Sequence, residues 1–189
     1  MKKILIIIVL SLCFIIPSQA DDIEDLKIEG ISVGDSALDF FTEDEIKSRS
    51  QPYPGNKRFT AVYNDKLDFF KTYDAVDFEY KNNDSKYIIH SVSGVIDWRN
   101  KKMSDCYKKM DEIISSLDEL MKDFRKTGRK NLKHPIKNRS GTYVSESFFS
   151  DRGRVAVTCY DYEPPQWDFL SVTVHTLEHN DFLLDEAYN

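Results

Sequence analysis

Two cysteines constrain what this chain can fold into more than any other feature. Cys106 lies where apolar residues have helical spacing, and Cys159 lies where apolar and polar residues alternate as in a strand. The third cysteine, Cys13, lies in the predicted leader described below; in an oxidising compartment the two that remain favour one disulfide, with two separate buried thiols as the alternative. The bond would join positions 53 apart and stabilise the fold by up to about 4 kcal/mol. We therefore expect a helix joined to a sheet.

The first twenty residues determine the compartment. Two lysines precede an apolar run at residues 4–16, and the small residues Ser18 and Ala20 then stand where a signal peptidase needs them. A cleaved signal peptide over residues 1–20 is favoured over a retained anchor, because a spanning helix needs about 20 apolar residues. Many Lys, Asn and Ile residues with few Gly and Ala are typical of an AT-rich bacterial genome. The expected location is therefore the bacterial periplasm.

The mature chain, residues 21–189, has the length and composition of one domain. Hydrophobic residues make up 41% and aromatic residues 13% of the sequence, more than a disordered chain carries. Loss of the two leader lysines leaves 24 basic against 32 acidic residues, a net charge of −8. Export argues against a nucleic-acid partner, and no transmembrane segment is expected in the mature chain.

Alternating or β-rich stretches predict six strands, and helical spacing or capping patterns predict three helical regions. The expected strands are residues 59–64, 73–81, 87–98, 143–149, 154–162 and 169–177, and the helical regions are one that starts at residue 35 and is ended by Pro52, then 104–126 and 182–188. We therefore expect an α+β fold, an antiparallel sheet of about six strands with helices packed on one face. The order also matches a tandem α-β-β-β duplication, the plan of β-lactamase inhibitor proteins and outer-membrane assembly lipoproteins. That likeness concerns the fold alone.

The clearest helix is expected over residues 104–126. Ser104 suits its N-cap, and Gly128 suits its end. Its apolar stripe comprises Cys106, Met110, Ile113, Leu117, Leu120 and Phe124. Cys106 begins this stripe and should therefore face the core.

One motif resembles a zinc site. His175, Glu178 and His179 match the H-x-x-E-H pattern, in which a helix brings both histidines onto one ion. Here the preceding residues predict a strand, which would place the histidines about 13 Å apart. We therefore expect an adventitious surface pair and no metal site.

No catalytic residue or cofactor is assigned. The chain lacks a nucleophile elbow, a glycine-rich phosphate loop, a calcium loop and a C-x-x-C pair. The acidic pairs Asp74/Asp77 and Asp161/Glu163 could serve an acid/base hydrolase, or simply lie on a solvated face. We favour a non-enzymatic binding domain, with such a hydrolase or an inhibitor of an envelope enzyme as alternatives.

A basic segment over residues 122–139 is the first binding candidate. It holds eight basic residues against one acid on an acidic protein. They are Lys122, Arg125, Lys126, Arg129, Lys130, Lys133, Lys137 and Arg139. Such a segment could dock an acidic envelope protein, anionic lipid or lipopolysaccharide. The alternative is a solvated loop that follows a helix C-terminus, where cations are favoured.

An aromatic group is the second binding candidate. Tyr160, Tyr162 and Trp167 flank Pro164 and Pro165 near a strand end. Together they could form a recognition patch, or could cover a sheet edge.

The segment Ile28-Glu29-Gly30-Ile31-Ser32-Val33-Gly34-Asp35-Ser36 resembles the opening of an uncharacterised family of small exported bacterial proteins, I-E-G-I-S-x-G-D-S. The resemblance extends through residues 71–76 and 93–97, the helix with Cys106 and the strand with Cys159. It implies an exported domain and carries over no activity and no site residues.

Overall fold

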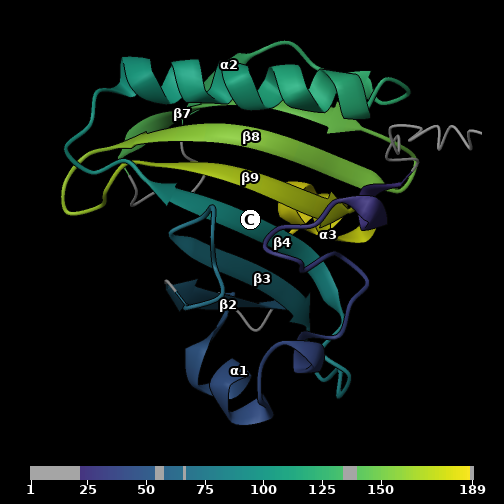
Figure 1. The fold of residues 1–189 in the computed structure, drawn as a ribbon. Helices are drawn as coiled ribbons and strands as arrows, with labels where there is room; N and C mark the ends of the chain where they lie inside the picture. Colours follow the sequence, from purple (N-terminus) through teal and green to yellow (C-terminus); the bar gives the residue numbers. More distant parts are fainter. Residues whose placement is uncertain (1–21, 54–57, 66, 134–139, 188–189) are drawn as a thin grey trace, which may run out of the picture.

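The computed structural model describes residues 22–53, 58–65, 67–133 and 140–187, so the predicted leader lies outside them. The described residues form one nine-stranded antiparallel sheet with the order β1-β2-β3-β4-β9-β8-β7-β5, and β6 also pairs with β7 (Figure 1). The strands are β1 (Ser50–Pro52), β2 (Phe59–Asp65), β3 (Ala75–Lys81), β4 (Ile89–Asp97), β5 (Arg125–Lys126), β6 (Lys130–Lys133), β7 (Gly141–Phe149), β8 (Gly153–Tyr162) and β9 (Phe169–Thr176).

Three α-helices accompany the sheet. They are α1 (Glu43–Arg49), α2 (Met103–Leu120) and α3 (Leu177–Asp185), and two short 3₁₀ turns, Ile23–Asp25 and Ala37–Asp39, precede them. Helix α1 begins with the predicted capping box, in which Thr42 accepts from the Glu45 N–H and Glu45 accepts from the Thr42 N–H.

The predicted α+β fold with an antiparallel sheet is confirmed, but the predicted size of the sheet, about six strands, is wrong. All six predicted strands are present, as β2, β3, β4, β7, β8 and β9, and β1, β5 and β6 raise the number to nine. These three are only two to four residues long, too short for an alternating pattern to show. The long strands are arranged symmetrically about the β4–β9 pair. This arrangement does not test the predicted tandem duplication, which stays a prediction.

The main core lies between the sheet and α2. Val155, Val157 and Cys159 alternate along β8 and are buried on the face that α2 covers (Figure 1). The predicted disulfide between Cys106 of α2 and Cys159 of β8 is confirmed, with a Cα–Cα distance of 6.2 Å. It ties the helix to the middle of the sheet.

Helix α2 is shorter than the sequence predicts. It starts after Lys102, not Ser104, and ends at Leu120, so Phe124 lies beyond it. The chain then turns back, and the following residues pair with β7, Arg125 with Phe149 and Lys126 with Phe148. Sheet pairing thus overrides a continuous helical pattern.

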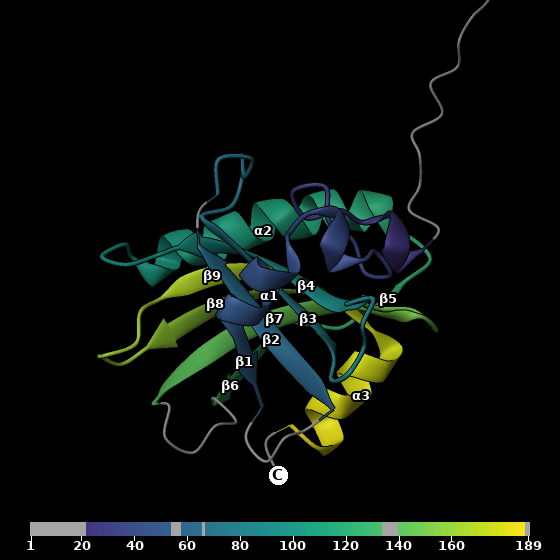
Figure 2. The ribbon, with the colours of Figure 1, turned by 90° about the horizontal axis from the view of Figure 1, so that it is seen from below.

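Helix α3 packs on the other face of the sheet, so the expectation of helices on one face is wrong. His175 neighbours Val174 on β9 and points away from the α2 face, and the ring of His179 stacks on it with 5.2 Å between centroids. Thr176 accepts a hydrogen bond from the His179 N–H and starts this helix well before the predicted residue 182. Figure 2 shows α3 beside the ends of β2 and β3.

Candidate functional site

The face of the sheet opposite α2 carries a polar pocket of about 530 Å³. Side chains of β3, β4, β9, β8 and β7 form its floor, and Leu183 and Leu184 of α3 form part of its wall. Strand alternation explains the contrast with the other face, because many of the buried apolar residues are followed by a serine, threonine or charged residue, as in Val157-Thr158 and Phe78-Glu79. We refer to this hollow as the sheet-face pocket.

Hydroxyl groups on neighbouring strands pair with one another across the pocket floor. Ser93 and Thr173 lie 2.9 Å apart, and Ser145 and Thr158 lie 3.0 Å apart. Each hydroxyl retains further capacity to donate or accept, so the floor offers hydrogen bonds to a polar ligand.

Four side chains at the α3 end of the pocket form a buried chain of contacts. Glu79 Oε2 lies 2.7 Å from His179 Nε2, and His179 Nδ1 lies 3.1 Å from His175 Nδ1. Ser91 Oγ lies 3.1 Å from the same His175 Nδ1. Glu79, Ser91 and His175 come from three adjacent strands, and His179 reaches down from α3.

This arrangement does not reproduce a Ser–His–acid triad. In a triad the serine and the orienting group use different ring nitrogens of the histidine, whereas Ser91 and His179 share His175 Nδ1. Burial, followed by the positive potential of His179 and Arg154, lowers the pKa of His175 well below its usual value. His175 is therefore neutral at neutral pH.

The predicted separation and surface location of the two histidines are wrong. His175 is 8% exposed and His179 is fully buried, because the chain leaves the strand at Leu177 and coils back. Among the described residues, no three His, Cys, Asp or Glu side chains are placed to hold a metal ion.

Asp77 lies beside Glu79 on the same face of β3. Burial raises its pKa to about 7; the Asn64 N–H, 3.3 Å from Oδ1, opposes this effect, while Glu79 and Asp65 add to it. Of the predicted acidic pairs, only Asp77 lies in this pocket, without Asp74. Near pH 7 the Asp77 carboxyl is therefore present in both its neutral and its charged form.

Arg154 of β8 is the cation of the pocket floor. Its Nε donates to Ser147 Oγ at 3.1 Å, and its guanidinium lies 5.5 Å from the centre of the Phe149 ring. In the described part of the chain it makes no ion pair with a carboxylate within 4.0 Å. Burial lowers the pKa of Arg154, yet a guanidinium stays charged in a protein.

The predicted basic segment divides into two parts, and the first faces α2. Lys126 contacts Asp118 at 2.6 Å and Glu146 at 3.1 Å. Arg129 pairs with Asp111 and lies 3.5 Å from Glu146. Acids of the protein itself therefore occupy these two cations.

The second part of the basic segment lies on the face of the pocket. Arg125 pairs with Phe149 in register and lies 4.8 Å from its ring centre, so Phe149 contacts both Arg125 and Arg154. Lys130 pairs with Ser145 and shares its face. The basic segment is thus partly strand. Of its remaining residues, Lys122 and Lys133 are exposed, and Lys137 and Arg139 lie outside the described residues.

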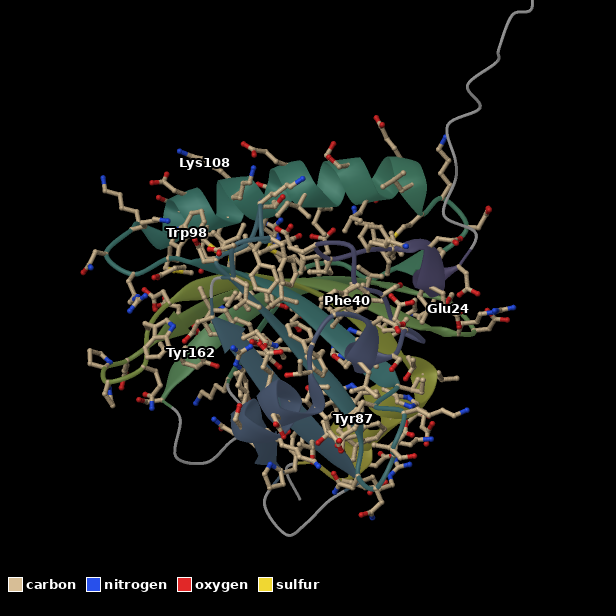
Figure 3. The ribbon with its side chains drawn as sticks, turned by 60° about the horizontal axis from the view of Figure 1, so that its bottom comes forward. Glu24, Phe40, Tyr87, Trp98, Lys108 and Tyr162 are labelled. Atoms are coloured by element: carbon tan, nitrogen blue, oxygen red, sulfur yellow. A yellow bond between two sulfur atoms is a disulfide. The ribbon has the colours of Figure 1, made fainter. Side chains whose placement is uncertain are left out.

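The predicted aromatic patch is divided between two hollows. Tyr160 lines the sheet-face pocket and stacks on Phe169, with 4.3 Å between ring centres. Tyr162, at the end of β8 (Figure 3), and Trp167 line an adjoining hollow. Sequence reasoning missed Arg154, Ser91 and Glu79 as site residues. The one signal available for them was that Arg154 and Glu79 are charged residues next to apolar positions of predicted strands.

Comparison with known proteins adds no relative. No family model, curated protein or solved structure matches this chain. Within the described ranges, none of the helices has the length and apolar character needed to cross a membrane.

Proposed function

We propose that this chain is a non-catalytic binding domain whose sheet-face pocket captures a small polar ligand bearing an anionic oxygen group. The observation that carries the proposal is Arg154, a partly buried guanidinium without an ion-paired carboxylate in the described structure. A buried charge is costly unless it is paired. A carboxylate or phosphate would supply that partner in the two-pronged geometry that arginine favours.

The two acids of the pocket do not cancel this preference. Glu79 contacts His179 at 2.7 Å, and the pKa of Asp77 is raised to about 7 by burial. The basic side chains Arg125 and Lys130 lie on the same face as Arg154. Their charges favour an anion at the β7–β8 side of the pocket.

The basic segment predicted contact with an anionic envelope component, and an anionic ligand is proposed here as well. The proposed contact surface is the sheet-face pocket instead of the whole basic segment. Lys126 and Arg129 are held by acids of α2 and β7, whereas Arg125 and Lys130 face the pocket side. If the leader directs export as predicted, the ligand is a molecule of the periplasm or envelope.

Titration calorimetry on oxidised residues 21–189 tests the proposal, with glucuronate and inorganic phosphate as anionic probes and glucose as the neutral probe. We expect an anion to bind, glucose to bind more weakly, and Arg154→Gln to weaken anion binding about ten- to a hundredfold, the value of a charged hydrogen-bond pair. Lys108→Gln, on the outer surface of α2 (Figure 3), is the control. Equal anion binding by Arg154→Gln, once shown to be folded, would contradict the proposal.

An acid/base hydrolase remains the second candidate, because Asp77 has a carboxyl with a pKa of about 7 next to Glu79. Two carboxyl groups in different environments are what acid and base roles require. Incubation of glycoside substrates with the wild-type protein and with Asp77→Asn tests this candidate. Hydrolysis by the wild type that Asp77→Asn abolishes would support a hydrolase and would contradict the proposal that the domain is non-catalytic.

A further inference from the structure

We propose that the ligand is an acidic oligosaccharide that places its anionic group on Arg154 and extends its sugar rings toward Trp167. This inference rests on the proposed function and names its substrate class. It starts from a second hollow of about 430 Å³ beside the sheet-face pocket. Asp77, Val95 and Phe169 line both hollows, so the two meet along β3, β4 and β9 and form one groove.

Exposed aromatic rings border the second hollow. Trp167 is 55% exposed and Tyr63 is 46% exposed, and both line this hollow, so their rings are accessible to a ligand there. The Arg99 guanidinium lies 5.2 Å from the Trp167 ring centre and is itself bound by Asp97, which helps to hold this ring in place. Flat rings of this kind pack against the apolar faces of sugar rings.

Polar groups stand around these aromatic rings. Gln51, Gln166 and Asp65 line the same hollow and provide amide and carboxylate groups for sugar hydroxyls. The sheet-face pocket continues the pattern with paired hydroxyls and the cation Arg154. An oligosaccharide with an acidic group at one end matches this order of aromatic, polar and cationic side chains along the groove.

The groove floor favours a sugar chain over an extended peptide. Strands β3, β4, β9 and β8 each pair on both sides, so their backbone groups are already hydrogen-bonded within the sheet. An added peptide strand needs an unpaired sheet edge, and the floor of this groove lacks one. Any occupant must therefore be bound by side chains, and here these are aromatic rings, hydroxyls, amides and charges.

An array of acidic oligosaccharides, their neutral parents, the corresponding acidic monosaccharides and carboxylate-ended tetrapeptides tests the inference. The oxidised mature chain is applied as wild type, Arg154→Gln, Trp167→Ala and the control Lys108→Gln. We expect capture by acidic oligosaccharides above all other probes. Arg154→Gln and Trp167→Ala should each weaken that capture by about tenfold or more, and Lys108→Gln should not change it. Thermal unfolding of each variant confirms that it folds.

The outcomes separate this inference from the proposed function. If acidic monosaccharides bind as well as the oligomers and Trp167→Ala changes nothing, the oligosaccharide inference is wrong while anion capture by Arg154 stands. Preference for the tetrapeptides, or for neutral parents, would also overturn it. If calorimetry with glucuronate and phosphate fails together with the array, both proposals fall.

Discussion

The Nδ1 atoms of His175 and His179 lie 3.1 Å apart, one at the end of a strand and the other in the first turn of the helix that follows. The contact holds α3 against the polar face of the sheet and closes one end of the pocket. Glu79 fixes the second ring from the opposite side. The position of α3 beside the pocket therefore depends on the contacts of these two rings.

We expect His175 to make the folded state less stable as the pH decreases from about 7 to 5, an effect opposite in sign to that of Asp77 over the same range. Its pKa is lowered in the folded state by burial, so below the ordinary value of 6.5 the unfolded chain binds a proton that the folded chain rejects. This group alone contributes a slope of up to about 1.4 kcal/mol per pH unit. Urea unfolding of wild type and His175→Gln across this range measures it; identical slopes would contradict the assignment.

Asp77→Asn should stabilise the protein above pH 7 and have little stabilising effect near pH 4. The folded pKa of about 7 exceeds the ordinary 3.8, so the folded state holds the proton more tightly and loses stability as the pH rises between these values. The full difference corresponds to about 4 kcal/mol as an upper bound. Chemical unfolding at pH 4 and pH 8 tests this, and an equal effect at both values would refute the raised pKa.

The disulfide should contribute about 2–4 kcal/mol to the free energy of unfolding. Cys106 and Cys159 are both fully buried and tie α2 to β8. We expect the Cys106→Ala/Cys159→Ala variant and the reduced wild type to lose similar stability in urea unfolding. A reduced protein as stable as the oxidised one would show that packing alone holds α2.

Charge reversal should distinguish the two parts of the basic segment. Arg125→Glu/Lys130→Glu changes the pocket face and should weaken binding of an acidic ligand with little loss of stability. Lys126→Glu/Arg129→Glu breaks contacts to Asp118 and Asp111 and places acids beside the largely buried Glu146, so it should lower stability instead.

Calorimetry and thermal unfolding on the two double variants give the comparison. Equal loss of ligand binding in both would indicate a continuous basic surface, as the sequence alone suggested, and would contradict the division at the sheet.

Much of the fold follows from local patterns, and the site does not. Alternation in 154–162 and helical spacing around Cys106 predict the strand and the helix, because each depends on neighbours in sequence, and the cysteine count of the mature chain predicts their bond. The contact between His179 and Glu79 joins residues 100 positions apart and depends on where α3 begins. Thr176 starts that helix, a capping role that a strand pattern over the same residues conceals.

Arg154 is a second residue whose place in the site local sequence patterns do not reveal. In sequence it is one charged residue beside Val155, and such residues usually face solvent. The neighbouring strands and Phe149 cover part of it on the pocket face, which requires the whole strand order to be known.

The position of β9 between β4 and β8 has a consequence for when the binding site comes into existence. β9 closes the gap between a group of strands made early and a group made after α2. A growing chain that has not reached Thr176 therefore lacks the strand that joins the two groups of strands into one groove floor. Ligand binding would thus report that the last strand has inserted, and a nascent or truncated chain would remain unable to bind.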